Sequence, residues 1–158
     1  MINHLINGLA YLVVTVILLG GNMENLVFKE DIILNVEDIL YLYNDVGWNS
    51  YTKDIDSLIK SIKNSLKVIS VWDKDLLVGL IRVVGDGHSI IYIQDILILQ
   101  KYQNRGIGKR LIEIILDKYK NVRQKVLLTD KEEKNILFYK KVGFSMAEEF
   151  GCVSFVKF

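Results

Sequence analysis

Hydrophobic side chains recur at helical spacing in four parts of the chain. In these parts the apolar residues lie three and four positions apart, which places them on one face of a helix. The spacing predicts helices near residues 36–46, 52–62, 107–119 and 131–142. Asn35 and Thr52 are the expected N-caps of the first two helices, and Gly143 is expected to end the last.

Elsewhere the apolar residues alternate or run continuously, which is typical of strands. Strands are expected near residues 26–29, 68–72, 76–84, 89–99, 125–129, 144–148 and 153–158. The polar turn 73–75 makes a hairpin of two of them, and the β-branched run 89–99 is expected in the centre of the sheet. This order of strands and helices predicts an α/β (α+β) fold, with a mixed sheet and helices on its faces.

Residues 1–23 form an apolar leader that contains no Lys, Arg, Asp or Glu. Three interpretations of it remain open. In the first, translation starts at Met23. In the second, residues 1–21 anchor the protein in a membrane, although the apolar run 5–19 is shorter than the ~20 residues of a span. In the third, the leader is a signal peptide that lacks the usual positive charge. The ordinary composition of the remainder favours the first, and predicts a cytoplasmic domain over residues 24–158.

The overall composition limits the class of protein. A chain of 158 residues fits one domain, and its 51% hydrophobic content excludes disorder for most of it. With 20 basic and 19 acidic residues, the chain lacks the positive charge typical of a nucleic-acid-binding protein. Cys152 is the single cysteine and the two histidines, His4 and His88, are far apart, so neither a disulfide nor a His-rich metal site is expected, and only a hard cation held by carboxylates stays open. Cys152 is expected in the core, and His88 on the surface in a turn.

A polar loop with two glycines connects the long strand to the helix near residue 107. The unpaired N–H groups and the dipole at the start of a helix attract anions, and glycines let an anion approach the main chain. Arg105, Lys109 and Arg110 add positive charge around Gly106 and Gly108. The loop is therefore suited to a phosphate or a pyrophosphate, although its spacing matches neither a P-loop nor a dinucleotide-binding fingerprint.

Two motifs resemble those of a known family. Gln103-Asn104-Arg105-Gly106-Ile107-Gly108 is similar to the Gln/Arg-x-x-Gly-x-Gly/Ala signature of the GNAT superfamily, the acyl-CoA-dependent N-acetyltransferases. Further along, Phe138-Tyr139-Lys140-Lys141-Val142-Gly143-Phe144 resembles the end of that family's late helix, Tyr-x-x-x-Gly-Phe. The early Val46-Gly47-Trp48-Asn49-Ser50-Tyr51-Thr52 is similar to a bacterial small-molecule branch of the same family.

The resemblance implies a fold and a chemistry. The implied fold is a mostly antiparallel sheet of about six to seven strands, splayed at the cofactor site and flanked by about four helices. Acetyl-CoA is the implied co-substrate, and no metal is needed. The primary amine of a small molecule attacks the thioester directly, so no covalent enzyme intermediate is required. Two alternatives remain open, a non-catalytic acyl-CoA-binding regulatory module and a protein N-terminal or lysine acetyltransferase.

The same resemblance implies roles for individual residues. The main chain of Ile96, Leu97 and Ile98 pairs with the pantetheine arm as if it were another strand. The loop that receives the pyrophosphate is formed by Gln103, Asn104, Arg105, Gly106, Ile107, Gly108 and Lys109. Tyr139 is the general acid that protonates the leaving thiolate. Asn135 is the implied cofactor-binding amide, although the family often has its asparagine seven residues before the tyrosine, where Glu132 lies here.

The acceptor side of the site gives weaker signals. Asp95 interrupts the apolar central strand, where a carboxylate is costly unless it is paired or used. It is a candidate proton acceptor or amine anchor, and the alternative is a structural pairing with Arg82. Trp48 and Tyr51 are candidate lining residues of the amine pocket, and the alternative is that they pack the early helices. A homodimer fits the commonest kind of assembly, and a membrane partner is expected only if residues 1–21 are an anchor.

Overall fold

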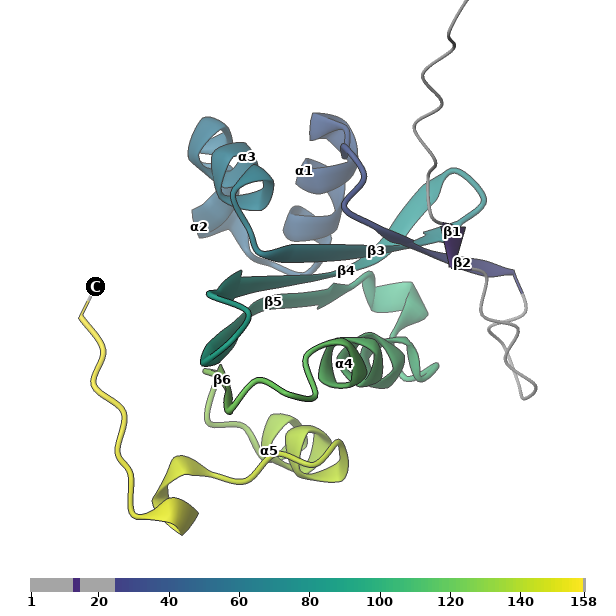
Figure 1. The fold of residues 1–158 in the computed structure, drawn as a ribbon. Helices are drawn as coiled ribbons and strands as arrows, with labels where there is room; N and C mark the ends of the chain where they lie inside the picture. Colours follow the sequence, from purple (N-terminus) through teal and green to yellow (C-terminus); the bar gives the residue numbers. More distant parts are fainter. Residues whose placement is uncertain (1–12, 15–24, 158) are drawn as a thin grey trace, which may run out of the picture.

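One twisted sheet with helices on both faces makes up the computed structural model, which describes residues 13–14 and 25–157 (Figure 1). Within these residues the strands are β1 Val13–Val14, β2 Leu26–Glu30, β3 Lys67–Asp73, β4 Leu76–Gly85, β5 Ile90–Ile98 and β6 Gln124–Leu127. The α-helices are α1 Val36–Asp45, α2 Asn49–Thr52, α3 Ile55–Lys63, α4 Ile107–Lys118 and α5 Glu133–Lys141. Two short 3-10 helices, η1 Gln100–Tyr102 and η2 Ala147–Phe150, complete the regular structure.

The sheet has the order β1-β2-β3-β4-β5-β6, and all pairs are antiparallel except β5 with β6. Helices α1, α2 and α3 cover one face, and α4 and α5 cover the other (Figure 1). Because both faces of β4 are covered, seven consecutive residues of this strand, from Leu77 to Val83, are buried. The mixed, mostly antiparallel sheet predicted from the sequence is confirmed.

The sheet splays where β5 leaves β6. The parallel pairing of these strands covers Ile90 to Ile93 of β5, whereas the pairing with β4 continues to Ile98. At Gln94 the register with β4 shifts by one residue, because Arg82 lies opposite Asp95. Such a bulge bends a strand and turns it away from its neighbour. From Gln94 onward the outer edge of β5 pairs with no other strand in the described part of the chain.

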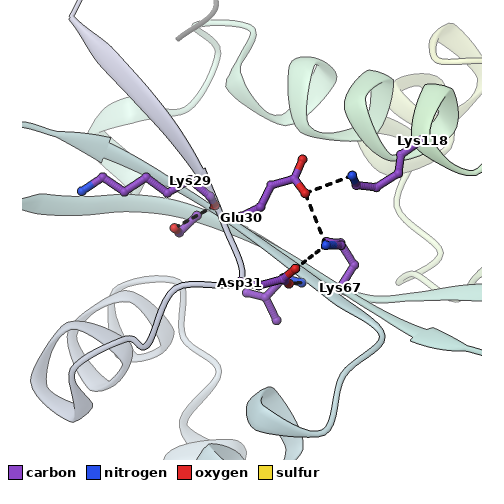
Figure 2. A network of polar contacts seen from close by, with 7 residues as sticks. Lys29, Glu30, Asp31, Lys67 and Lys118 are labelled. Atoms are coloured by element: carbon purple, nitrogen blue, oxygen red, sulfur yellow. Dashed lines mark hydrogen bonds and ion pairs between the residues drawn. The ribbon is translucent and has the colours of Figure 1, made fainter. Parts of the chain in front are cut away.

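A charged network connects α4 with strands β2 and β3 of the sheet (Figure 2). Glu30 at the end of β2 lies 3.3 Å from the ammonium of Lys67 in β3 and 3.0 Å from that of Lys118 in the last turn of α4. Lys67 also pairs with Asp31. Single surface ion pairs contribute little, but this network joins three elements, and its central residues Glu30 and Lys67 are largely shielded from water. It therefore helps to hold α4, whose first turn belongs to the loop with two glycines.

Two helix starts differ from the predicted ones. Asn35 precedes α1 as expected, but its side chain caps no helix N–H and donates to Asp38 instead. The second long helix begins after Asp54, whose carboxylate accepts from Ser57 N at 3.0 Å. Thr52, the predicted cap, ends the short helix α2 and donates to the Asn44 side chain. The prediction of Thr52 as a cap was wrong because the extra turn α2 moves the true start two residues along.

The C-terminal part also differs from the prediction. The strands expected at 144–148 and 153–158 do not form in the described residues, where η2 and irregular chain follow α5. Alternating apolar residues form a strand only when another strand pairs with their main chain, and no such pairing reaches this segment in the described residues. Phe155 is 94% exposed, and Cys152 is exposed rather than buried in the core.

The predicted leader 1–23 and the residue Phe158 lie outside the described residues, apart from Val13 and Val14. These two residues form β1, which pairs antiparallel with Phe28 and Lys29. Among the described helices, none combines the length and the apolar character that a membrane crossing requires. The described residues also contain no group of three or more His, Cys, Asp or Glu side chains suited to a metal ion.

Candidate active site

The loop before α4 presents a row of main-chain donors. Asn104 and Gly106 both adopt left-handed backbone conformations, with φ of 61° and 85°, and α4 begins at the next residue. The first hydrogen bond of the helix runs from Arg110 N to Gly106 O at 3.0 Å. Consequently the amides from 105 to 109 have no acceptor among the described residues. A loop with this geometry at a helix N-terminus is an anion-binding nest.

Side chains around this loop hold it against the end of β5. Gln103 Nε2 donates to Ile98 O at 3.0 Å, which ties the loop to the last residue of the strand. The guanidinium of Arg105 lies 4.8 Å from the ring centre of Tyr102 and donates to Lys101 O at 2.7 Å. Positive charge therefore lies at the root of the loop, and the main-chain N–H groups at its tip have no acceptor in the part of the chain that the structure describes. The sequence-predicted loop residues are brought together as expected.

The exposed edge of β5 leads directly into this loop. Leu97 is buried, whereas the neighbouring side chains Ile96 and Ile98 are half-buried. Antiparallel pairing with β4 uses only the main-chain groups on one side of the strand. The groups on the other side lie along the gap that β6 leaves, so an extended ligand can pair with them as an added strand.

Tyr139 and Asn135 lie on α5, which packs beside the first turn of α4. A Cβ at Gly108 would lie 3.5 Å from the ring of Phe138, so this glycine lets α5 approach closely. Tyr139 packs edge-on against Phe138 and Phe144, at ring distances of 5.1 and 6.1 Å. Burial raises the pKa of Tyr139, and a hydrogen bond with Thr129 opposes this shift. The hydroxyl therefore carries its proton at neutral pH, as a general acid must.

On the opposite face of the sheet, three aromatic rings form a cluster. Trp48 and Tyr51 stack with their ring centres 5.4 Å apart, and Tyr43 lies 6.2 and 6.0 Å from them. Tyr43 is fully buried, Trp48 is half-buried and Tyr51 is exposed. Gln94 Nε2, from the bulge of β5, lies 3.5 Å from the Tyr51 hydroxyl. The two predicted acceptor residues therefore lie together beside the bulge, and Gln94 is a member that the sequence did not reveal.

Asp95 is part of a buried charged network. Its Oδ2 accepts from the Tyr43 hydroxyl at 2.6 Å and from Arg82 Nε, while Arg82 Nη1 lies 3.4 Å from Ser65 Oγ. Burial and the Asp95 carboxylate raise the pKa of Tyr43. The structural pairing with Arg82, left open by the sequence, is confirmed. Since the Asp95 side chain has no exposed surface, it makes no contact with solvent at the acceptor side. Its other oxygen, Oδ1, is buried without a hydrogen-bond partner among the described residues.

His88 lies exposed in the turn between β4 and β5, as the sequence predicted. Its amide donates to Asp86 Oδ1 at 2.8 Å. This turn is at the opposite end of β5 from the loop before α4. His88 therefore belongs to neither side of the candidate site.

Comparisons with known proteins agree with the geometry of the loop and the sheet. Residues 39–158 match the family described as the acetyltransferase (GNAT) domain. Over 133 residues the chain is 31% identical to the uncharacterized N-acetyltransferase ycf52-like of Prochlorococcus marinus, covering 80% of this chain and 72% of that protein. Over 142 residues it is 26% identical to the histone acetyltransferase TAP1 of Glycine max, covering 82% of this chain and 60% of that protein. The chain thus spans less than two-thirds of the soybean relative.

Solved structures share the same fold. The GNAT family acetyltransferase SP0256 from Streptococcus pneumoniae has a TM-score of 0.76 and 35% identity, covering 84% of this chain and 97% of that one. AAC(6')-Iy, solved in complex with the bisubstrate analogue CoA-S-monomethyl-acetylneamine, has a TM-score of 0.65 and 15% identity over 84% of this chain and 97% of that one. The second likeness concerns the fold alone. With a family match over most of its length, the chain belongs to the GNAT family of acetyltransferases and is an acyltransferase enzyme.

Proposed function

We propose that this enzyme transfers the acetyl group of acetyl-CoA directly to the primary amine of a small molecule. The observation that carries the proposal is the free edge of β5, from Gln94 to Ile98, which runs into a loop of free main-chain donors. An extended arm that ends in a pyrophosphate matches this combination. Coenzyme A has both parts, because its pantetheine amides pair like a strand and its pyrophosphate is an anion.

The cofactor is held mainly by the main chain in this proposal. Ile96, Leu97 and Ile98 pair with the pantetheine arm, and the amides between Arg105 and Lys109 receive the pyrophosphate oxygens. Gln103 and Asn104 shape the loop, through the bond to Ile98 O and through the left-handed backbone. Asn135, in the first turn of α5, is proposed as a further polar group for the arm.

The reaction needs few protein groups. The neutral amine attacks the thioester carbonyl carbon, a C–N bond forms, and the carbonyl oxygen becomes an oxyanion that a free N–H of β5 stabilises. Collapse of this intermediate breaks the C–S bond, and the sulfur takes the proton of the Tyr139 hydroxyl. The amine nitrogen gives up a proton to water, which restores Tyr139 through solvent. Products are the acetamide and free coenzyme A.

The acceptor amine enters from the side of α1 and α2 in this proposal. The stacked rings of Trp48 and Tyr51 offer a flat aromatic surface of which Tyr51 is exposed, suited to an ammonium or to the apolar part of an amine. Gln94, beside Tyr51, adds a hydrogen-bonding amide at the bulge. A small molecule fits this short surface, and AAC(6')-Iy, of the same fold, was solved with a small-molecule bisubstrate analogue.

Asp95 acts indirectly in this proposal. Its carboxylate has no exposed surface and is already bound by Arg82 and Tyr43, so it takes no proton from the amine. We assign it the role of holding the bulge of β5 against α1. Trp48 and Tyr51 follow α1 directly, so the shape of the acceptor surface depends on this buried contact.

A second candidate is an amine of a protein, favoured by one relative that is named a histone acetyltransferase. Two measurements separate the alternatives. Calorimetry with acetyl-CoA tests the cofactor site, and release of free thiol in the presence of a panel of amines and of lysine and N-terminal peptides tests the acceptor. Turnover with small amines is expected to exceed that with peptides. Peptide turnover alone would overturn the small-molecule acceptor, and absence of binding at high micromolar acetyl-CoA would overturn the entire proposal.

A further inference from the structure

Asp45, the last residue of α1, binds the chain just after β5 in two places. Its carboxylate Oδ2 accepts from the main-chain N–H of Gln100 at 2.7 Å, and its carbonyl oxygen accepts from the Gln100 side-chain amide. Gln100 is the first residue of η1, and η1 leads into the loop before α4. One residue of the acceptor-side helix therefore contacts the root of the proposed pyrophosphate loop.

The position of this carboxylate is unfavourable for α1 itself. The C-terminal end of a helix carries partial negative charge, so an acidic side chain in the last turn is disfavoured. Within α1 no basic side chain compensates in that turn. The carboxylate is half-buried and its described hydrogen-bond donor is Gln100, 55 residues away in sequence. The tertiary contact, rather than helix stability, accounts for an aspartate at this position.

A second contact joins α1 to β5, and it comes from Tyr43, two residues before Asp45 in the helix. Tyr43 donates to Asp95 at 2.6 Å, so α1 is attached to β5 on both sides of the segment 96–99. This segment contains the residues that pair with pantetheine in the proposed function. On its other side, η1 is fixed by Tyr102, whose hydroxyl donates to Asp73 Oδ2 at 2.7 Å. The root of the loop is thus held between α1 and β3.

We infer that Asp45 is a positioning residue that couples the amine site to the acetyl-CoA site. This inference rests on the proposed function. Amine binding at Trp48 and Tyr51 fixes the end of α1, and Asp45 transmits that order to Gln100 and to the loop beyond it. Coupling of two binding sites is reciprocal, so acetyl-CoA tightens amine binding by the same factor. Neither substrate touches Asp45.

The test compares Asp45→Ala, Asp45→Asn and Asp54→Ala with the wild type. The alanine variant loses the acceptor for Gln100 N, whereas asparagine keeps a carbonyl oxygen there. Asp54→Ala is the matched control, because it removes an exposed carboxylate at the start of another acceptor-side helix, α3, and the hydrogen bonds of this carboxylate in the described residues are with Ser57. The dissociation constant of CoA is measured by calorimetry with and without a saturating amine substrate, together with kcat and both KM values.

In the wild type, saturating amine is expected to lower the dissociation constant of CoA. In Asp45→Ala this effect is lost and the KM of acetyl-CoA rises roughly tenfold, the size expected for one hydrogen bond to a charged group. The value of kcat at saturation changes little, Asp45→Asn restores most of the coupling, and Asp54→Ala retains all of it. A general loss of stability cannot produce this pattern, because Asp54→Ala also weakens a helix.

The inference and the proposed function fail in different ways. If the wild type binds no acetyl-CoA, the proposed function is wrong. If the wild type turns over and Asp45→Ala keeps the same KM and the same response to the amine, the cofactor site stands and the coupling through Asp45 is overturned. The coupling is also overturned if the dissociation constant of CoA for the wild type is the same with and without the amine.

Discussion

The proposed cofactor side and acceptor side of this enzyme consist of different kinds of groups, main-chain amides in the first and side chains in the second. In the proposed function, the binding groups of the cofactor side are the main-chain amides of one continuous stretch, from the end of β5 to the first turn of α4. On the acceptor side, the groups are side chains from α1, α2, β4 and β5, which come together only in the folded protein. The first arrangement depends on backbone conformation, and the second depends on packing.

This difference predicts how each side responds to change. A backbone nest needs particular glycines and tolerates many side chains around them, because the ligand contacts the main chain. A packed aromatic surface above a buried ion pair is sensitive to the loss of one buried partner, while its exposed rings are free to vary. We therefore expect related chains to share the transfer of the acetyl group from acetyl-CoA and to differ in the amine that they accept.

The largest effect is expected for Gly106→Glu. Gly106 has φ of 85°, where a residue with a Cβ is strained, and a carboxylate there repels the pyrophosphate. Calorimetry should detect no binding of acetyl-CoA, while circular dichroism shows a folded protein. The matched control is Gly151→Glu, which puts the same side chain at φ of 69° in the open C-terminal segment. If Gly106→Glu binds acetyl-CoA like the control, the nest does not hold the pyrophosphate.

The next effect concerns the buried network of the acceptor side. Asp95→Ala leaves Arg82 charged, buried and without its partner, and should lower the free energy of unfolding by about 3–5 kcal/mol in urea denaturation. The double variant Arg82→Met, Asp95→Leu removes both charges and should recover much of this loss. Acceptor KM should rise in the double variant, because the bulge of β5 loses its bond to Tyr43. Equal stability of Asp95→Ala and the wild type would contradict the role of the pair.

The sequence revealed the cofactor side because its chemistry is local. Gln103 to Gly108 are consecutive, and a strand before them and a helix after them follow from the apolar spacing. The same local signals identified α1, α3, α4, α5 and five of the strands, although the start of α3 was predicted too early. For Asp95 the sequence left two interpretations open, a proton acceptor or amine anchor and a structural pairing with Arg82, because a carboxylate inside an apolar strand is costly unless it is paired or used.

The other features could not be predicted from the sequence, because they depend on contacts between residues that are distant in the chain. The bulge at Gln94 arises from register against β4, and no residue type marks it. In the sequence Asp45 is an ordinary aspartate, and only the fold brings Gln100, 55 residues away, into hydrogen-bond distance of it. The C-terminal strands were predicted from alternation alone, and Phe155 is exposed because alternation does not supply a pairing edge.

An intermediate effect is expected for Tyr139→Phe, which tests the chemistry on the cofactor side. Loss of a general acid typically slows the reaction by about 10²-fold or more, so kcat should fall by that order while the affinity for acetyl-CoA is unchanged. Tyr119→Phe is the control, because Tyr119 is also a partly buried tyrosine with a raised pKa and lies at the far end of α4.

The pH profile gives an independent check on Tyr139. An acid works only while it is protonated, and burial raises the pKa of this hydroxyl above its usual value of 10.0. The kcat of the wild type should therefore show no alkaline decline below about pH 10. A decline centred near neutral pH would assign the acid role to another group, and a fall in acetyl-CoA affinity in Tyr139→Phe would make it a binding residue.

The smallest effect is expected at the turn between β4 and β5, which belongs to neither side. Asp86 accepts from the amides of His88, Ser89 and Ile90 and from the Ser89 hydroxyl. The Ser89 hydroxyl and these amides lower the pKa of Asp86. A carboxyl whose pKa is lower in the folded state stabilises the fold above the unfolded pKa of about 3.9, and this contribution is lost as the pH falls through the folded pKa.

Asp86→Ala should therefore lower Tm slightly at pH 7 and leave kcat and both KM values unchanged. The difference in Tm from the wild type should shrink as the pH falls below about 4, because the Asp86 carboxyl of the unfolded wild type takes up a proton there, whereas that of the folded protein does so only at lower pH. Asp86→Asn keeps a carbonyl acceptor and should lie between the two. If Asp86→Ala changed the acceptor KM as much as the Arg82, Asp95 double variant does, the acceptor side would extend along all of β5, and the separation of the enzyme into a main-chain side and a side-chain side would not hold.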